Sequence, residues 1–184
     1  MGYKNSIDSS TLANKCLELI EAMYLFEISM EHLDIVIHPE ALIHSIIEYS
    51  NNTSIFNYFY NDMSIPILNF IKYITNKKLE KINKFKFNKN FNLNFTEVDK
   101  SKFPIYNIFK NIDYKSPEQI IKFNAANHYA TELFRKNMIK YIEMPKIIEK
   151  SISCELNASI NSIGSIIKYE NEFNKIIINK YEKI

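Results

Sequence analysis

The chain has 184 residues, 46% of them hydrophobic, and a formal net charge of +2 at pH 7. This length suits one ordinary domain or two small ones with a buried core, and so balanced a charge does not by itself indicate a polyanion-binding protein. Gly2 and Gly164 are the only glycines, which excludes a glycine-rich phosphate loop and a dinucleotide fingerprint within this chain.

Cysteine usage and hydropathy indicate the compartment. Cys16 and Cys154 lie far apart without motif spacing, so we expect free thiols in a reducing environment. The N-terminus lacks an apolar signal core, and no apolar run approaches the length of a membrane span. We therefore expect a cytoplasmic protein, or one from a plastid-type organelle whose targeting segment is missing, with neither a membrane nor a nucleic acid as partner.

The first predicted element is a helix over residues 11–26. Residues 1–6 have no helical or strand period, whereas Asp8, Ser9 and Ser10 are all suitable N-caps. Helical rotation then separates an apolar side from a polar side. The apolar side contains Leu12, Cys16, Leu19, Ile20 and Met23. The polar side contains Thr11, Asn14, Lys15, Glu18 and Glu21.

The start of this helix has the chemistry of an anion site. Serine hydroxyls, the Asn14 amide and the Lys15 ammonium gather where a helix carries about half a positive charge, which favours a phosphate. Glu18 follows one turn later, where it can hold a metal ion or balance Lys15. An i,i+3 surface pair worth about 0.2–0.5 kcal/mol is the simpler interpretation, since no Asp/Glu/His cluster supplies further ligands.

The next segments predict a sheet and a helix. Leu33, Ile35 and Ile37 alternate within residues 31–38, which indicates a strand ended by Pro39. Residues 41–49 and 53–60 are β-rich and flank Asn51-Asn52, which predicts a hairpin. A helix should follow from Asp62 to about residue 73, with Asp62 as a cap and Met63 in the core. The pattern is typical of an α+β domain with a partial, mainly antiparallel sheet.

Residues 75–102 differ in composition and pattern from the preceding segments, because lysines are frequent and helical periodicity is lost. Aromatic and apolar residues alternate with polar ones at Phe85, Phe87, Phe91, Leu93 and Phe95. An extended connector against a domain surface explains this pattern, and so does a basic-aromatic strand for single-stranded nucleic acid. We favour the connector, because any half-buried strand in a lysine-rich chain has this alternation.

The remainder, residues 103–184, predicts a small C-terminal helical bundle. Ser116 and Gln119 have the spacing of a capping box, with Pro117 at the first helical position. Further helices are expected over 145–153 and 161–181. The expected apolar side of the helix after Ser116 consists of Ile120, Ile121, Phe123, Ala126, Ala130, Leu133 and Phe134. The predicted division is 1–74, a 75–102 connector, and 103–184.

Two histidines lie close together, on either side of Pro39. One of His38 and His44 is a possible substrate or metal contact. A histidine hydrogen-bonded at a strand end is the better interpretation from spacing alone.

Several motifs together resemble the family of 1-deoxy-D-xylulose-5-phosphate reductoisomerases. The likeness begins at the predicted anion site and continues in the same order along the whole chain. The segments that carry it are Met1-Gly2, Lys4, Ile7-Asp8-Ser9-Ser10-Thr11, Asn14-Lys15, Leu17-Glu18, Ile37-His38-Pro39, Ile43-His44-Ser45, Asp62-Met63, Pro66-Ile67, Phe103-Pro104 and Asn124-Ala125-Ala126-Asn127.

The resemblance implies an enzyme that rearranges and reduces deoxyxylulose phosphate to methylerythritol phosphate for isoprenoid biosynthesis, with NADPH and Mg²⁺ or Mn²⁺. It implies that Ser9, Asn14 and Lys15 hold the phosphate of a phosphorylated sugar. It makes Glu18 a metal ligand that also contacts the substrate, and brings His44 near the catalytic site. Of the remaining residues, it places Gly2 against NADPH, and Met1 and Met63 near the nicotinamide.

The same resemblance covers only the C-terminal half of the family. The family's nucleotide-binding domain and its Asp-Ser-Glu segment, which gives two further carboxylate ligands, precede the matching region. Residues 1–74 then correspond to part of the catalytic domain, and we expect the isolated chain to be inactive. The alternatives are a split enzyme completed in trans by an N-terminal half, a homodimer of such chains, or a non-enzymatic remnant. Departures from the family pattern occur at Ser10, Cys16, Glu40, Ala41, Ser64 and His128.

Overall fold

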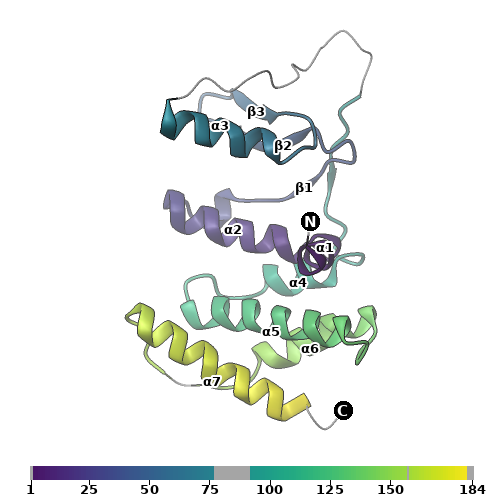
Figure 1. The fold of residues 1–184 in the computed structure, drawn as a ribbon, viewed down its shortest axis with the longest axis vertical. Helices are drawn as coiled ribbons and strands as arrows, with labels where there is room; N and C mark the ends of the chain where they lie inside the picture. Colours follow the sequence, from purple (N-terminus) through teal and green to yellow (C-terminus); the bar gives the residue numbers. More distant parts are fainter. Residues whose placement is uncertain (1, 77–91, 157, 182–184) are drawn as a thin grey trace. The chain divides into compact units, whose positions relative to one another are not determined.

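The computed structural model describes residues 2–76, 92–156 and 158–181 (Figure 1). The chain forms two compact units, one of residues 1–35 with 99–184 and one of residues 36–98. No described helix is long and apolar enough to cross a membrane. The elements are α1 (Tyr3–Ser10), α2 (Ala13–Phe26), the 3₁₀ helix η1 (Met30–His32), β1 (Val36–Ile37), β2 (Ile43–Glu48), β3 (Ser54–Tyr58), α3 (Ser64–Thr75), β4 (Thr96–Glu97), α4 (Pro104–Lys110), α5 (Pro117–Arg135), the 3₁₀ helix η2 (Tyr141–Glu143), α6 (Met144–Ile152) and α7 (Ile163–Tyr181).

The N-terminal segment folds differently from the prediction. It forms α1, in which Lys4 and Asp8 make an i,i+4 ion pair of 2.5 Å and Ile7 is buried. The N-cap prediction for Asp8, Ser9 and Ser10 was therefore wrong, because all three lie in the last turn of α1. Eight residues with one buried aliphatic side chain are too short to give a recognisable period.

A sharp corner separates α1 from α2. Leu12 has a left-handed backbone, with φ of 62°, and its buried side chain lies among the core residues. The predicted helix over 11–26 is confirmed from Ala13 to Phe26. Cys16, Leu19 and Ile20 are buried as expected, while Met23 is only partly so.

The helices from α4 onward form the predicted bundle, and α1 and α2 pack onto it. Figure 1 shows α2, α4, α5 and α7 as successive layers of this unit, with α6 beside α5. Since each fully buried large apolar side chain contributes about 1.5–3 kcal/mol, this core dominates the stability of the unit. Its largest buried apolar side chains are Tyr169, Phe109, Phe123, Phe173, Ile105, Met144, Ile148 and Ile177.

The start of α5 follows the sequence prediction. Ser116 is the N-cap, and its hydroxyl accepts a hydrogen bond from the Gln119 backbone N–H at 3.3 Å. The hydroxyl itself donates to the Glu118 carboxylate at 2.8 Å. Phe123, Ala126, Ala130 and Leu133 are buried as predicted, and Ile120, Ile121 and Phe134 are half-buried. The helices expected over 145–153 and 161–181 are α6 and α7.

The strand predicted over residues 31–38 was wrong for most of its length. Residues 30–32 form η1, and only Val36 and Ile37 are in a strand. Residues 33–35, between η1 and β1, contact α4 through a side-chain hydrogen bond, in which the Tyr106 hydroxyl donates to Asp34 at 3.1 Å. The alternation therefore marked a segment outside any strand, residues 33–35, in which the Ile35 side chain is buried.

The unit of residues 36–98 contains two antiparallel strand pairs, β2 with β3 and β1 with β4. The hairpin is confirmed, with Asn52 at a φ of 62° in the turn. The N-cap of α3 is Met63, and the carboxylate of Asp62, one position earlier than a cap, accepts the Ser64 N–H at 2.9 Å. Met63 is 61% exposed, so the expectation that it is a core residue was wrong. The α+β class is confirmed.

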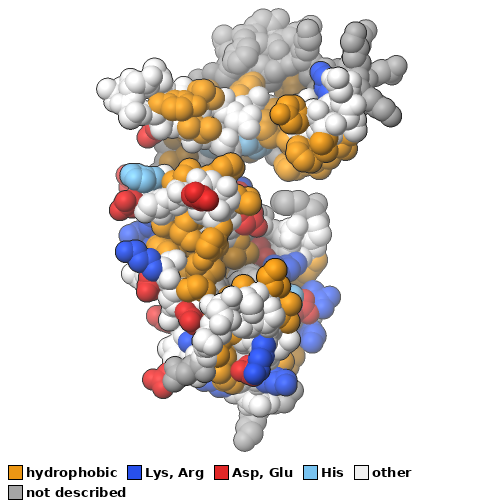
Figure 2. All heavy atoms as spheres, turned by 90° about the vertical axis from the view of Figure 1, so that its left-hand side faces the viewer, with side chains coloured by type: hydrophobic (Ala, Val, Ile, Leu, Met, Phe, Trp, Pro, Cys, Tyr) orange, Lys and Arg blue, Asp and Glu red, His pale blue; other side chains and the backbone are white. Residues whose placement is uncertain are grey.

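Within residues 36–76 and 92–98, no residue is fully buried. Apolar side chains lie on the surface of this unit instead, as the orange groups in the upper part of Figure 2 show. The described part of this unit therefore buries too little apolar area to form a core of its own. Its apolar side chains that are more than half exposed are Tyr73, Phe70, Ile74, Met63, Ile67, Ile55 and Ile47.

Residues 1–35 pack with the C-terminal helices in one unit. In the expected connector, Phe85, Phe87 and Phe91 lie outside the described residues. Of the part that the structure describes, Leu93 and Phe95 are exposed, and Thr96–Glu97 forms β4.

The end of α2 generates a stability prediction. Glu27 is an exposed C-cap in the left-handed region, with φ of 54°, where glycine avoids the Cβ clash. We expect Glu27→Gly to raise the free energy of unfolding by about 0.5–1 kcal/mol, measured by urea denaturation. The matched control is Glu21→Gly, exposed in the middle of α2, which should lower it by about 1 kcal/mol. Destabilisation by both variants would contradict the prediction.

Candidate functional site

Three of the predicted site residues converge on the first turns of α2. The Asn14 amide donates to the Glu18 carboxylate at 2.6 Å. The Lys15 ammonium donates to both oxygens of the same carboxylate, at 2.8 and 2.7 Å. The Lys15 and Glu18 side chains are each about half exposed, so the pair contributes only about 0.2–1 kcal/mol and is easily exchanged for a ligand.

The backbone adds donors to this cluster. The first intrahelical bond at the corner runs from the Cys16 N–H to the Leu12 carbonyl, at 3.0 Å. The N–H groups of Asn14 and Lys15 therefore belong to the first turn, where a helix offers no acceptor of its own. Ser9 lies directly before the corner, half-buried, and its carbonyl accepts the Leu12 N–H at 3.3 Å. The arrangement suits an anion of the size of phosphate.

A buried carboxylate lies behind the corner. Asp8 is only 1% exposed, and its Oδ1 accepts hydrogen bonds from the Asn127 amide at 3.0 Å and the Thr131 hydroxyl at 3.3 Å. The sequence prediction missed this role, because it treated Asp8 as a cap. The i,i+4 spacing of Lys4 and Asp8 was the available signal for a helix there.

A second contact reaches the corner from η2. The Tyr141 hydroxyl donates to the Ser10 carbonyl at 3.2 Å, and the ring packs edge-on against Phe134. The C-terminal helices thus contact the α1–α2 corner through polar groups at two places.

The structure does not bring all of the predicted site residues into one cluster. Gly2 is the exposed N-cap of α1, and Met1 lies outside the described residues. His44 and Met63 belong to the other unit, where the ring of His44 stacks on Phe59 and its Nε2 donates to the Phe59 carbonyl at 3.2 Å.

His38 is hydrogen-bonded at the end of β1, as the simpler interpretation predicted. Its Nδ1 donates to the Asn94 carbonyl at 2.8 Å and lies 3.1 Å from the Glu40 carboxylate. The Asn94 side-chain amide bonds to the same carboxylate, which lowers the pKa of Glu40. These contacts hold β1 and the segment before β4 together.

The described residues contain no group of three His, Cys, Asp or Glu side chains that could hold a metal ion. Glu18 is therefore a single carboxylate with Asn14 and Lys15 around it. One carboxylate does not fulfil the ligand set of a divalent cation, which takes six or more oxygens, so Glu18 alone does not make a metal site.

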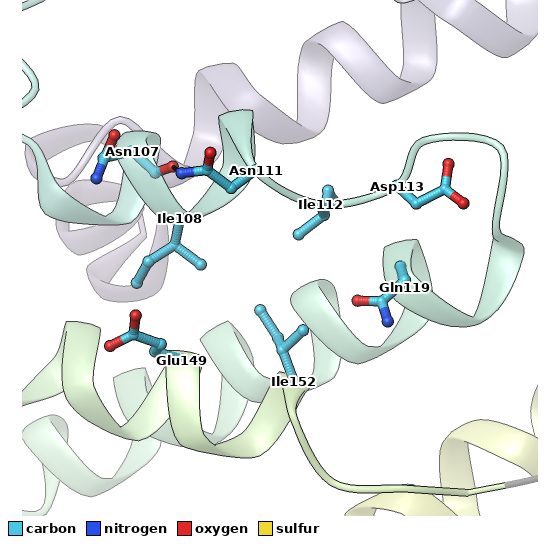
Figure 3. A pocket seen from close by; sticks show the side chains of 8 residues that line it. All are labelled: Asn107, Ile108, Asn111, Ile112, Asp113, Gln119, Glu149 and Ile152. Carbon is cyan, nitrogen blue, oxygen red and sulfur yellow. Dashed lines mark hydrogen bonds between the residues drawn. The ribbon is translucent and has the colours of Figure 1, made fainter.

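A surface hollow of about 380 Å³ lies elsewhere, between α4, α5 and α6 (Figure 3). In the figure, Ile108 and Ile152 point into it, with Glu149 and Gln119 at its sides. Its lining contains none of the predicted site residues. The anion-type chemistry is at the α1–α2 corner instead.

Comparison with known proteins identifies the family. The model of the DXP reductoisomerase C-terminal domain matches residues 60–176. A second model, of the 1-deoxy-D-xylulose 5-phosphate reductoisomerase C-terminal domain, matches residues 1–26, which include the corner. This chain belongs to the DXP reductoisomerase family. The resemblance drawn from the motifs is confirmed.

Curated reductoisomerases align with nearly the whole chain. The enzyme of Prochlorococcus marinus (strain NATL1A) is 33% identical, and the alignment covers 100% of this chain and 45% of that enzyme. That of Clostridium tetani (strain Massachusetts / E88) is 35% identical, with 98% and 47% covered. The chain thus spans about half the length of the curated relatives it matches and corresponds to their C-terminal part.

Solved reductoisomerase structures share the fold. The Zymomonas mobilis enzyme in complex with NADPH superposes with a TM-score of 0.82 at 30% identity, covering 96% of this chain and 47% of that one. A complex with NADPH, fosmidomycin and magnesium gives 0.81 at 27% identity, with 98% and 46% covered.

The buried thiol of Cys16 yields a chemical prediction. Burial raises the pKa of its thiol to about 12, so at pH 8 only about one part in ten thousand is thiolate. Cys154 is partly exposed. We expect a thiol reagent to label one equivalent of folded protein at pH 8, with Cys154→Ser abolishing the signal and Cys16→Ser leaving it. Rapid labelling of two thiols would contradict the burial of Cys16.

Proposed function

We propose that this chain forms one side of a reductoisomerase active site. In this proposal the α1–α2 corner binds the phosphate of the substrate. The observation that carries the proposal is the convergence of Asn14, Lys15 and Glu18 on the first turns of α2. The family match over residues 1–26 supports it, because this segment includes the corner.

Under this proposal, Ser9, Asn14 and Lys15 bind the phosphate. An arriving dianion competes with Glu18 for the Lys15 ammonium, which is half exposed and therefore free to turn. Glu18 is then released for its proposed role as a metal ligand that contacts the substrate. The exchange needs little energy, since a surface ion pair is weak.

The metal ion and NADPH need groups beyond the described residues of this chain. Glu18 is one carboxylate, and Gly2, Met1, His44 and Met63 are proposed neighbours of the nicotinamide and of the reacting centre only by family resemblance. We therefore propose that the chain alone is inactive. Three further points stay predictions from the sequence. They are the use of Mg²⁺ or Mn²⁺, a cytoplasmic location, and domain boundaries after residues 74 and 102.

An enzyme completed in trans by a complementary N-terminal half is the second candidate. The observation in its favour is the unit of residues 36–98, whose described residues include none that is fully buried. Apolar side chains such as Phe70 and Tyr73 gain stability only when another surface covers them. A homodimer offers such a surface too, whereas a non-enzymatic remnant does not require one.

The phosphate site is tested by titration with inorganic phosphate. We expect the backbone amide resonances of Asn14 and Lys15 to shift on binding, and Lys15→Ala to weaken the affinity by about tenfold or more, since a hydrogen bond to a charged group contributes about 1.5–3 kcal/mol. Lys146→Ala, an exposed lysine on α6, is the matched control and should leave the affinity unchanged. Equal affinities of the two variants would refute the site.

Activity is tested by mixing the chain with substrate, NADPH and Mn²⁺ and following the nicotinamide absorbance. We expect no decrease for the chain alone. If the enzyme is completed in trans, adding the N-terminal half of a family member lowers the nicotinamide absorbance. The Lys15→Ala variant of this chain should then show no such decrease. A decrease with the chain alone would disprove the proposed inactivity, and none with the pair would favour the remnant.

A further inference from the structure

We propose that Asp8, Asn127 and Thr131 form a positioning cluster through which the C-terminal helical bundle sets the geometry of the anion site. None of the three is itself a predicted ligand. The inference rests on the proposed phosphate site, and it adds that α5 takes part in that site without touching the anion.

The cluster is a fully buried polar contact between distant parts of the chain. Asn127 and Thr131 lie one turn apart on α5 and are both 0% exposed, and their side chains donate to the same Asp8 oxygen. A carboxylate in such an environment is tolerated only when donors compensate for the lost water. The position of Asp8 is therefore fixed by α5.

Asp8 is linked to α2 by a short relay of hydrogen bonds. Its carbonyl accepts the hydroxyl proton of Thr11 at 3.2 Å, and the Thr11 oxygen accepts the N–H of Ala13 at 3.4 Å. Ala13 is the first residue of α2, one position before Asn14. A displacement of Asp8 therefore moves both Ser9, which follows it directly, and the first turn of α2.

The cluster also compensates the negative charge of Asp8. Its Oδ1 is taken by Asn127 and Thr131, and its Oδ2 by the Lys4 ammonium at 2.5 Å. A carboxylate directly before Ser9 would repel a phosphate if an oxygen faced it. With both oxygens engaged by donors, that repulsion is reduced.

Tyr141 makes a second, independent contact with the α1–α2 corner. Its hydroxyl donates to the Ser10 carbonyl, two residues after Asp8 and one after Ser9. Because the ring keeps its packing against Phe134 when the hydroxyl is removed, Tyr141→Phe tests the polar contact alone.

The experiment compares Asn127→Ala with Asn124→Ala, in the full chain. Asn124 lies one turn earlier on α5 and is exposed, so it is the matched control. We measure the affinity for inorganic phosphate and the amide hydrogen exchange of Thr11, Leu12 and Cys16, whose N–H groups are bonded within the corner. Thr131→Val is a milder variant that keeps the proposal testable if Asn127→Ala does not fold.

We expect Asn127→Ala to weaken phosphate binding about tenfold, because catalytic and binding groups are sensitive to displacements below 1 Å. Corner amides should exchange faster while those of α7 keep their protection, and Asn124→Ala should match the wild type. A residue that only stabilises the fold would change the unfolding midpoint and leave the affinity of the folded protein unchanged.

Unchanged affinity and corner exchange in the folded Asn127→Ala and Thr131→Val variants would overturn the positioning role. If Lys15→Ala weakens phosphate binding and these variants do not, the positioning role of the cluster is refuted and the proposed function stays intact. If the wild-type chain binds no phosphate, the proposed site fails instead, and corner exchange alone decides whether α5 holds the corner.

Discussion

The hydrogen bond between Asp8 and Asn127 joins residues 119 positions apart, and the arrangement of the larger unit depends on it. It connects α1, a helix of eight residues with little apolar surface, to the central helix of the bundle. A buried carboxylate without its donors is strongly unfavourable, so this contact specifies one orientation of α1 where hydrophobic packing alone would allow several. The corner at Leu12, and with it the start of α2, follows from that orientation.

The two units differ in how they are stabilised. The unit of residues 1–35 and 99–184 has a continuous aromatic and aliphatic core that includes Phe109, Phe123 and Phe173. The unit of residues 36–98 has backbone pairing in a hairpin, and its contacts around His38 and Glu40 are polar. Two-stranded pairs whose apolar side chains stay exposed are at best marginally stable in water, so the described part of this unit depends less on burial than the larger unit does.

The chemistry of the proposed site depends on its weak contacts. Lys15 and Glu18 lie on the exposed side of α2, while Cys16 between them is in the core. The helix therefore presents charge to the solvent and is held by its opposite side. A rigid, buried frame with exchangeable surface ion pairs is well suited to binding a charged ligand, since neither partner must be taken out of a low-dielectric interior.

The sequence by itself determined the features that depend on neighbouring residues. The cap at Ser116 and the hairpin at Asn52 follow from local hydrogen bonding and backbone preference, and the motifs from Met1 to Asn127 identified the family. Only the tertiary structure decided that Asp8 is buried, that α1 exists, and that residues 33–35 are not part of a strand. In each of these cases the stabilising partner, such as Asn127 or Tyr106, lies more than 70 residues away. Local patterns carry no information on such contacts, because their free energy depends on which distant surface is brought close.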